Sequence, residues 1–297
     1  MTPSAPVPPV PRPWPFPLTL RRVLFPTDLR SESDAAFSHA VLVAEHFHAE
    51  LRLFHSIDVR QVGRTVGGGA PMAEAMRVAE DSAIRFLEAR AAQTSARTRV
   101  TVEYGLSPHQ AVVAAIAAAG ADLTVMSTHG RTGFAHALLG SVAETAIEEG
   151  GRPTLCVRAR HAAPAAYRRI LVPTDLRARG AFPFAAFLAR GFGAQVIAVH
   201  LVPFTRASFS GLPQALDSAV PTEEDVLRFL APDFDGTSVR ARVELGPGWG
   251  SIPRIAREER CDLIAMPAGH RDHLAGAVLG SHAERTVAMA PCPVLVV

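Results

Sequence analysis

The chain has 297 residues, of which 48% are hydrophobic and 20% are charged, and its formal net charge is +2. This length suits two domains of roughly 150 residues each, and nothing in the charge balance favours binding to nucleic acid or to a membrane surface. All 30 basic residues are arginine, which excludes the chemistry of a Walker-loop lysine or a Schiff-base lysine.

The N-terminal segment and the cysteines indicate the cellular compartment of the protein. Residues 1–17 are too rich in proline for a signal peptide, and no later run reaches the roughly 18 apolar residues of a membrane span. We expect residues 1–18 to be a disordered tail, with an SH3-type ligand as the alternative. The cysteines Cys156, Cys261 and Cys292 show no metal-binding spacing, so we expect buried thiols in a cytoplasmic protein.

In the first half, short apolar runs alternate with longer segments of helical spacing. The apolar runs are predicted strands, because they are brief and are bounded by turn residues or charges. We place the strands at 23–26, 51–57, 99–104, 122–126 and 154–158, and the helices at about 33–48, 72–93, 108–119 and 139–149. The glycine-rich segment 63–71 is predicted to be a flexible connector, with a phosphate-binding loop as the alternative.

The same order of elements returns in the second half. RVLFPTDLR at 22–30 matches RILVPTDLR at 169–177, and LLGSVAET at 138–145 matches VLGSHAER at 278–285. The second set of strands falls near 169–173, 195–202, 238–245, 262–266 and 293–297, with a shorter second helix around 222–231. This alternation predicts two tandem α/β domains, 19–158 and 169–297, each with a doubly wound, five-stranded parallel sheet. Residues 159–168 are the predicted linker.

Ligands of open α/β sheets bind beyond the carboxyl ends of the strands, where helix N-termini present free amides. In the first half, Thr27 and Asp28 follow the first strand, and Gly140 and Ser141 begin the last helix. The glycine allows a close approach to the backbone and unusual dihedral angles, so this pair predicts an anion site. A capping box formed by Ser141 and Glu144 is the alternative.

The aspartates Asp28 and Asp175 occupy matching positions at the ends of the two first strands. A carboxylate repels phosphate, so each is predicted to accept a hydrogen bond from a ribose hydroxyl or a base amino group. The alternative is an N-cap for the following helix.

The histidines do not predict a metal site. His129 and His136 lie in one loop and His109 is remote in the sequence, and the three lack the spacing of a zinc site. His55 and His200 match each other inside the second strands and are predicted core residues.

Several of these segments together resemble the universal stress protein family. The resemblance rests on VLFPTDLR, LRLFHSID, DLTVMSTHGRTGFAHALLGSVAE and the ending PCPVLVV, and it covers both halves from about residue 20 to residue 297. The ATP-binding motif of that family, G-x2-G-x9-G-[ST], corresponds here to Ser127, Gly130, Gly140 and Ser141, with the first glycine altered. The resemblance implies adenine-nucleotide alpha-hydrolase-like domains with strand order 3-2-1-4-5, paired through their apolar fifth strands.

The resemblance also implies which residues bind ATP, with magnesium as an optional companion. In the first half these are Asp28, Ser56, Met126, Ser127, Gly130, Gly140, Ser141 and Val142, and we add Thr27 and Arg131 from their positions beside these residues. Ser56 is expected near the adenine, and Gly140 to Val142 are expected around the phosphates. For Arg131 a solvated side chain is an equal alternative.

The second half departs from the motif. It keeps Asp175, Gly280 and Ser281, but Pro267 and His270 replace the first two motif positions. If the loop needs a positive φ at residue 270, histidine costs about 1 kcal/mol there, and its ring occupies phosphate space. We therefore predict a degenerate second site.

The sequence thus predicts a cytoplasmic stress-response protein that binds ATP in its first domain. We expect no enzyme activity and no redox cofactor, because the crevice lacks lysine and a paired carboxylate. Partners other than the nucleotide are expected to be neither nucleic acid nor membrane. The two domains form an internal pair, and a further homodimer is left open. The alternatives are a ligand-free interaction module and slow ATP hydrolysis.

Overall fold

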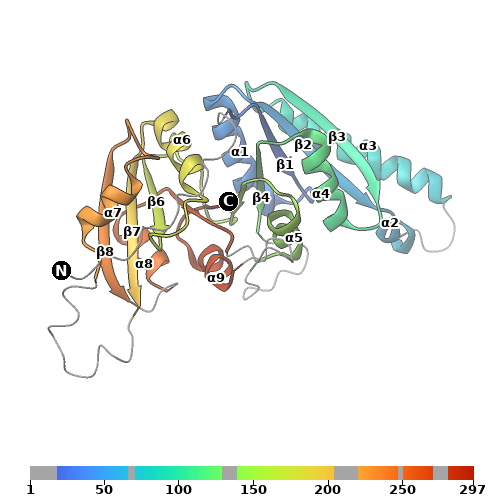
Figure 1. The fold of residues 1–297 in the computed structure, drawn as a ribbon. Helices are drawn as coiled ribbons and strands as arrows, with labels where there is room; N and C mark the ends of the chain where they lie inside the picture. Colours follow the sequence, from blue (N-terminus) through green and yellow to red (C-terminus); the bar gives the residue numbers. More distant parts are fainter. Residues whose placement is uncertain (1–18, 66–70, 129–138, 204–219, 247–249, 270–279) are drawn as a thin grey trace, which may run out of the picture.

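A computed structural model describes residues 19–65, 71–128, 139–203, 220–246, 250–269 and 280–297 (Figure 1). Its strands form one sheet in the order β3-β2-β1-β4-β5-β10-β9-β6-β7-β8. The strands of the first half are β1 (Arg22–Pro26), β2 (Glu50–Asp58), β3 (Thr98–Gly105), β4 (Leu123–Ser127) and β5 (Thr154–Val157). Those of the second half are β6 (Arg169–Thr174), β7 (Gln195–Pro203), β8 (Val239–Gly246), β9 (Leu263–Met266) and β10 (Val294–Val296).

Each half therefore has the expected strand order, and the expected pairing through the fifth strands is also found. Strands within a half are parallel, whereas β5 and β10 are antiparallel. Cys156 lies opposite Val294 and Leu155 opposite Leu295. These side chains are buried, so the apolar edge that each half would expose alone is covered by the other half.

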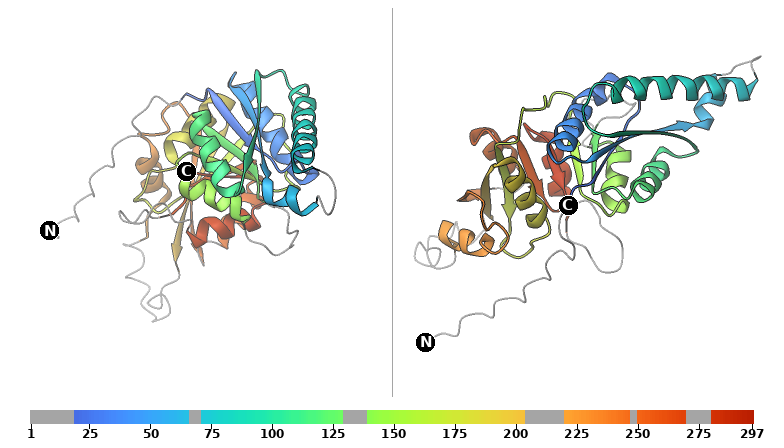
Figure 2. Two further views of the ribbon diagram at one scale, coloured as in Figure 1. Left: turned by 90° about the vertical axis from the view of Figure 1, so that its right-hand side faces the viewer. Right: turned by 90° about the horizontal axis from the view of Figure 1, so that it is seen from above.

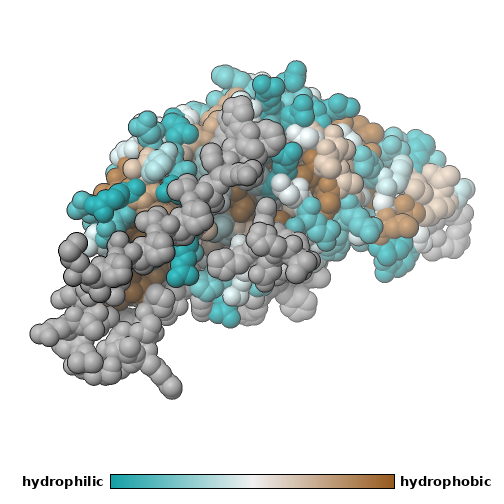
Figure 3. All heavy atoms as spheres, in the orientation of Figure 1, coloured by the Kyte–Doolittle hydropathy of each residue, from teal (hydrophilic) through white to brown (hydrophobic). Residues whose placement is uncertain are grey.

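Helices cover both faces of the sheet (Figure 1). They are α1 (Asp34–His46), α2 (Val59–Thr65), α3 (Met72–Ala91), α4 (Pro108–Ala119), α5 (Ser141–Glu149), α6 (Phe182–Phe192), α7 (Glu223–Leu230), α8 (Ser251–Glu258) and α9 (Ser281–Met289), with a 3-10 turn at Ser31–Ser33. Helix α3 lies along the outer side of the first half, away from the junction (Figure 2). Figure 3 shows hydrophilic side chains over much of one outer face, with smaller hydrophobic areas between them.

Alternation along the strands divides the core between the two faces. Val23 and Phe25 of β1 point toward α1, in a hydrophobic cluster that also includes α6 and runs through both halves. Leu24 points to the opposite face, where the first half packs against α4 and α5. On that opposite face, a separate cluster joins the second half to α8 and α9. This cluster also includes Ile147 of α5 and Cys156 of β5, so the core crosses the junction on both faces.

Aromatic rings join α1 to α6 at the junction. Phe47 stacks on Phe187 with ring centroids 4.9 Å apart, and its ring meets the edge of Phe192 at 5.3 Å. His46 Nε2 lies 2.8 Å from the carbonyl oxygen of Gly191. A Cβ atom at Gly191 would lie 2.4 Å from the Phe47 ring, so this close approach requires glycine.

The predicted linker contributes two buried side chains to the same junction. Tyr167 donates its hydroxyl to His39 Nδ1 at 2.7 Å, and His39 Nε2 donates to the carbonyl of His161 at 3.3 Å. His161 Nδ1 accepts the Arg158 amide, while its Nε2 donates to the Ala290 carbonyl. Neutral rings protonated on Nε2 satisfy all four contacts. Burial lowers the pKa of both histidines to about 4.

The first strand of each half ends in the same turn. Thr27 Oγ1 accepts the Leu29 amide, and Thr174 Oγ1 accepts the Leu176 amide, each at 3.0 Å. Leu29 has φ 65° and Leu176 has φ 59°, a left-handed conformation that costs a leucine roughly 1 kcal/mol. The repeat therefore extends to backbone strain at the ends of β1 and β6.

Some details differ from the sequence predictions. Helix α2 was not expected, and it includes the start of the predicted connector 63–71, of which 66–70 lie outside the described residues. Cys156, Cys261 and Cys292 are buried free thiols, as expected. Within the described parts of the chain, no helix combines the length and the apolar character needed to cross a membrane.

Candidate functional site

A cavity of about 370 Å³ opens at the carboxyl ends of β1, β2 and β4. The N-termini of α4 and α5 form its opposite wall. Of the predicted site residues, the structure places these around the cavity: Thr27, Asp28, Ser56, Met126, Ser127, Gly140, Ser141 and Val142. The other two, Gly130 and Arg131, lie outside the described residues. The cavity is within the 300–1,000 Å³ typical of small-molecule sites.

The wall at α5 presents backbone amides. Gly140 is the N-cap, and its carbonyl accepts the amides of Ala143 and Glu144 at 2.9 and 3.0 Å. The amides of Ser141 and Val142 donate to no acceptor among the described residues. Helix N-termini carry a partial positive charge, so these two donors suit an anion.

The capping-box alternative is wrong. Ser141 is the first helical residue rather than the N-cap, and α5 has no side-chain cap. The Ser141 hydroxyl instead lies 2.9 Å from His109 Nε2. The same holds in the second half, where Gly280 is the N-cap of α9 and no side-chain cap forms. The serine hydroxyl of the first half therefore faces α4 and the cavity.

Unusual dihedral angles do not explain the two glycines, contrary to expectation. Gly140 has φ −68° and ψ 136°, and Gly280 has φ −66° and ψ 143°, values that any residue adopts. Space does not demand glycine at residue 280 either, because a Cβ there would lie 3.4 Å from the Ala268 oxygen and 3.5 Å from Gly269 Cα, which are ordinary van der Waals distances. The described surroundings of this N-cap therefore accept a Cβ atom.

The two matched aspartates close turns and do not cap helices. Asp28 Oδ1 accepts the Ser33 hydroxyl at 3.0 Å and the Arg30 amide at 3.3 Å. Asp175 Oδ1 accepts the amides of Arg177 and Ala178 at 2.9 and 3.0 Å. The N-caps of α1 and α6 are other residues, so the N-cap alternative is wrong. The Asp28 carboxylate lines the cavity.

Apolar side chains also line the cavity, where Phe54 and Met126 lie with Ser56. His55 Nδ1 lies 2.8 Å from the Thr27 carbonyl, and His200 makes the matching contact to Thr174 at 2.9 Å. His55 is buried, as predicted for a core histidine, and it also borders the cavity, which the sequence did not indicate.

The predicted set also omits other residues that line the cavity, among them Asp58, Gln61 and His109. Burial would raise the pKa of the Asp58 carboxyl, but the Arg60 amide and guanidinium outweigh this effect and hold the pKa below its usual value. Asp58 is therefore an anion at neutral pH. His109 is remote in the sequence, yet α4 starts at the same sheet edge as α5, and this shared edge is the signal that could have found it.

The second half keeps the backbone of the site but changes its side chains. Gly280 donates to Ala268, as Gly140 does to Thr128, at 2.7 Å in both cases. Ser127 donates its hydroxyl to the Glu32 carbonyl at 3.3 Å, a bond that Pro267 at the matching position has no hydroxyl to make. His270 lies outside the described residues.

Metal ligands do not gather around either crevice in the part of the chain that the structure describes. No three His, Cys, Asp or Glu side chains lie there in positions that could hold an ion. His129 and His136 lie outside the described residues.

The geometry thus defines a tandem of two doubly wound α/β domains joined through their fifth strands, with a ligand-sized cavity at the strand ends of the first. The sequence model of the universal stress protein family matches residues 19–158 and 166–297. The chain belongs to this family.

Relatives in sequence and in structure agree with that assignment. Universal stress protein MJ0531 of Methanocaldococcus jannaschii is 30% identical over 140 residues, covering 46% of this chain and 82% of its own. MJ0577 of the same organism is 24% identical, covering 48% and 96%. The crystal structure of a universal stress protein from Archaeoglobus fulgidus has a TM-score of 0.62 at 21% identity, covering 94% and 96% of the two chains, and it supports the fold of the whole tandem.

Proposed function

We propose that this protein is a stress-response protein that binds an adenine nucleotide, ATP, in the cavity of its first half. The observation that carries the proposal is the pair of amides at Ser141 and Val142, which face a 370 Å³ cavity without an acceptor among the described residues. The family membership adds a reason to choose a nucleotide among anions. Asp28 disfavours a bare phosphate at the β1 end, where a ribose hydroxyl would donate to it.

The proposed pose follows from the residues that line the cavity. The phosphates lie against the start of α5, where the helix dipole and the amides stabilise negative charge. The adenine lies against Phe54, Ser56 and Met126. The ribose lies between them beside Asp28. In the second half, Pro267 and His270 replace the small motif residues, and we propose that this half is mainly structural.

We propose binding without efficient turnover, in the cytoplasm. The chain has no lysine to stabilise a developing charge on the γ-phosphate. His109 Nε2 lies 2.9 Å from the Ser141 hydroxyl, so His109 is the side chain to remove in a test for hydrolysis. Incubation with ATP and chromatography of the nucleotide should return ATP unchanged. Phosphate release that depends on His109 would favour slow hydrolysis instead.

The test uses the duplication as its control. Gly140→Trp places an indole against the two amides, and its backbone angles suit any residue, so the variant should fold. Gly280→Trp makes the same change at the matching N-cap of the second half. Isothermal titration with ATP should show binding by the wild type and by Gly280→Trp, and at least a tenfold loss, about 1.4 kcal/mol, in Gly140→Trp.

Two results would contradict the proposal. Equal ATP affinity in the wild type and in Gly140→Trp would exclude this cavity. No binding at millimolar ATP would favour the ligand-free interaction module. Cyclic AMP serves as a second ligand in the same titration, because a universal stress protein has been crystallised in complex with cAMP.

A further inference from the structure

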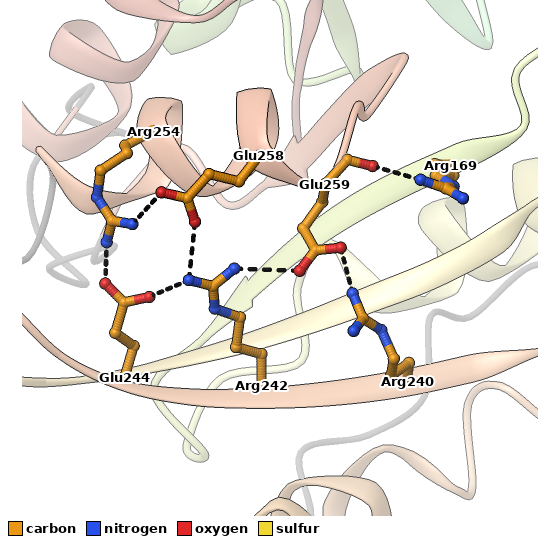
Figure 4. A network of polar contacts seen from close by, with 7 residues as sticks. All are labelled: Arg169, Arg240, Arg242, Glu244, Arg254, Glu258 and Glu259. Atoms are coloured by element: carbon orange, nitrogen blue, oxygen red, sulfur yellow. Dashed lines mark hydrogen bonds and ion pairs between the residues drawn. The ribbon is translucent and has the colours of Figure 1, made fainter.

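The outer strand of the second half is linked to α8 by a closed network of charges (Figure 4). Arg242 of β8 lies at its centre and pairs with Glu244, Glu258 and Glu259 at 2.6–3.1 Å. Arg254 bridges Glu244 and Glu258, and Arg240 bonds to Glu259. Three arginines and three glutamates thus neutralise one another between the strand and the helix.

The first half has the same backbone at this place. Arg22 donates to the Ala119 carbonyl near the end of α4, as Arg169 donates to the Glu259 carbonyl at the end of α8. Asp122 accepts the amide of Arg21, just before β1, and Asp262 accepts the matching amide of Arg168, just before β6. These contacts fix the register between the halves.

That register shows which side chains were exchanged. The β8 residues Arg240, Arg242 and Glu244 correspond to Arg99, Thr101 and Glu103 of β3. Arg254 and Glu258 of α8 and its C-cap Glu259 correspond to Ala114, Ala118 and Ala119 of α4. Every charged residue that the second half places on its helix is an alanine in the first half.

A groove of about 160 Å³ lies where these side chains are missing. Its lining includes Arg52, Arg99, Glu103, Ala118 and Ala119. Arg52 and Arg99 are direct neighbours across β2 and β3. Arg52 pairs with Glu50, whereas Arg99 and Glu103 have no polar partner among the described residues. Two arginines therefore face an alanine surface, and only one has a carboxylate.

We propose that this groove binds an acidic segment of a partner protein, whose adjacent carboxylates occupy the place that Glu258 and Glu259 fill in the second half. Arg99 receives a carboxylate as Arg240 does from Glu259. Glu103 corresponds to Glu244, which pairs with Arg254 in the second half. Glu103 therefore favours a basic residue in the bound segment, at the end away from its carboxylates, and so fixes the direction in which the segment binds. The groove is smaller than the usual 300–1,000 Å³ of small-molecule sites, which favours side chains of a macromolecule as its occupant.

The competing explanation is that Arg99 and Glu103 only protect an edge strand. Charged side chains on edge strands commonly prevent unwanted strand pairing. That role needs no occupant, and it predicts no preference for carboxylates. A second copy of this chain is another occupant, since Glu223 and Glu224 are adjacent and exposed on α7.

The test measures fluorescence anisotropy of the full chain with a fluorescein-labelled peptide, GEEGSGRG, and with its reverse, GRGSGEEG. A matched peptide with glutamine in place of both glutamates is the ligand control. Arg99→Glu reverses the groove charge, and Arg85→Glu makes the same change in net charge on the exposed face of α3, away from the groove. Ala119→Glu places a carboxylate where the second half has Glu259.

The wild type and Arg85→Glu should bind one of the glutamate peptides and not the glutamine peptide. Arg99→Glu should weaken this binding at least about tenfold, and added salt should weaken it in the wild type. In Ala119→Glu the new carboxylate should compete with the peptide and abolish binding. Arg99→Gln replaces this variant if Ala119→Glu fails to fold, and its affinity should lie between those of the wild type and Arg99→Glu.

No binding of either glutamate peptide by the wild type would overturn the proposal. Equal affinities of Arg99→Glu and Arg85→Glu would also overturn it, in favour of edge protection. If light scattering shows a homodimer that only Arg99→Glu dissociates, the occupant is a second copy and the proposed partner protein is wrong.

Discussion

The surfaces around β3 and β8 show how two copies of one fold come to differ. Both strands are the outer strands of the described sheet, and both lie beside a helix that ends at the same contact with the first strand of its half. Around β8 the space is filled by paired charges, and around β3 it is an open groove. The backbone contacts were kept in both copies, whereas the side chains that face solvent diverged. Divergence at such positions changes binding without changing the fold.

Acid should have the largest effect, because it acts on the buried histidines at the junction of the halves. His39 and His161 have pKa values of about 4 in the folded chain and 6.5 as the ordinary value. As the pH falls below 6.5, the unfolded chain takes up protons that the folded chain does not, so stability falls. Each histidine should lower the free energy of unfolding by about 3 kcal/mol once the pH is below 4, and by about 2 kcal/mol at pH 5.

Urea unfolding of the wild type and of His39→Gln at pH 7 and pH 5 measures this effect. His39→Gln keeps an acceptor for Tyr167 and removes one titrating group. It should lose about 2 kcal/mol less than the wild type over this interval. Equal losses would show that His39 does not resist protonation.

Helical glycines give the second comparison. Gly191→Ala would place a Cβ 2.4 Å from the Phe47 ring and should destabilise the junction by about 1–3 kcal/mol. Gly63→Ala in α2 meets only Met72 Cε at 3.6 Å, and it should stabilise by up to about 1 kcal/mol. Thermal unfolding of both variants checks the opposite signs. A stabilised Gly191→Ala would mean that α1 and α6 pack less closely than described.

The charge network gives the smallest effect and the sharpest contrast between the outer strands. Arg242→Met removes three ion pairs whose partners are partly exposed, and it should cost about 1 kcal/mol. Arg99→Met removes no ion pair made with a described residue, and it should change stability by less than about 0.5 kcal/mol. Urea midpoints of the two variants measure the difference. Equal losses would contradict the assignment of the network to the second half alone.

Much of the fold follows from short-range patterns in the sequence. The apolar runs of β1 and β6 and the repeated PTD turns predict both halves, whereas the pairing of the fifth strands came from the resemblance to the family. Helix α2 was missed, since Val59–Thr65 lies next to a glycine-rich stretch that reads as a connector. The capping box was wrong because Gly140, not Ser141, supplies the first accepting carbonyl of α5.

The candidate site is predictable only in part. Thr27, Ser127 and Gly140 meet because the carboxyl ends of parallel strands share one edge, which topology alone implies. Gln61 and His109 enter through α2 and α4, whose starting points the sequence does not fix to within one residue, and Asp58 is the last residue of β2. The groove at β3 could not be found from one copy. It becomes visible only when Ala118 and Ala119 are set beside Glu258 and Glu259 in a common register.

The seam between β5 and β10 has a consequence for the newly made protein. Thr154 to Cys156 leave the ribosome about 140 residues before their partners Val294 to Val296, an interval of roughly 7–28 s at ordinary rates of translation. During that interval the first half can fold while its apolar border strand has nothing beside it. The nascent chain is then most exposed to chaperones and to mispairing with neighbouring chains on the same messenger.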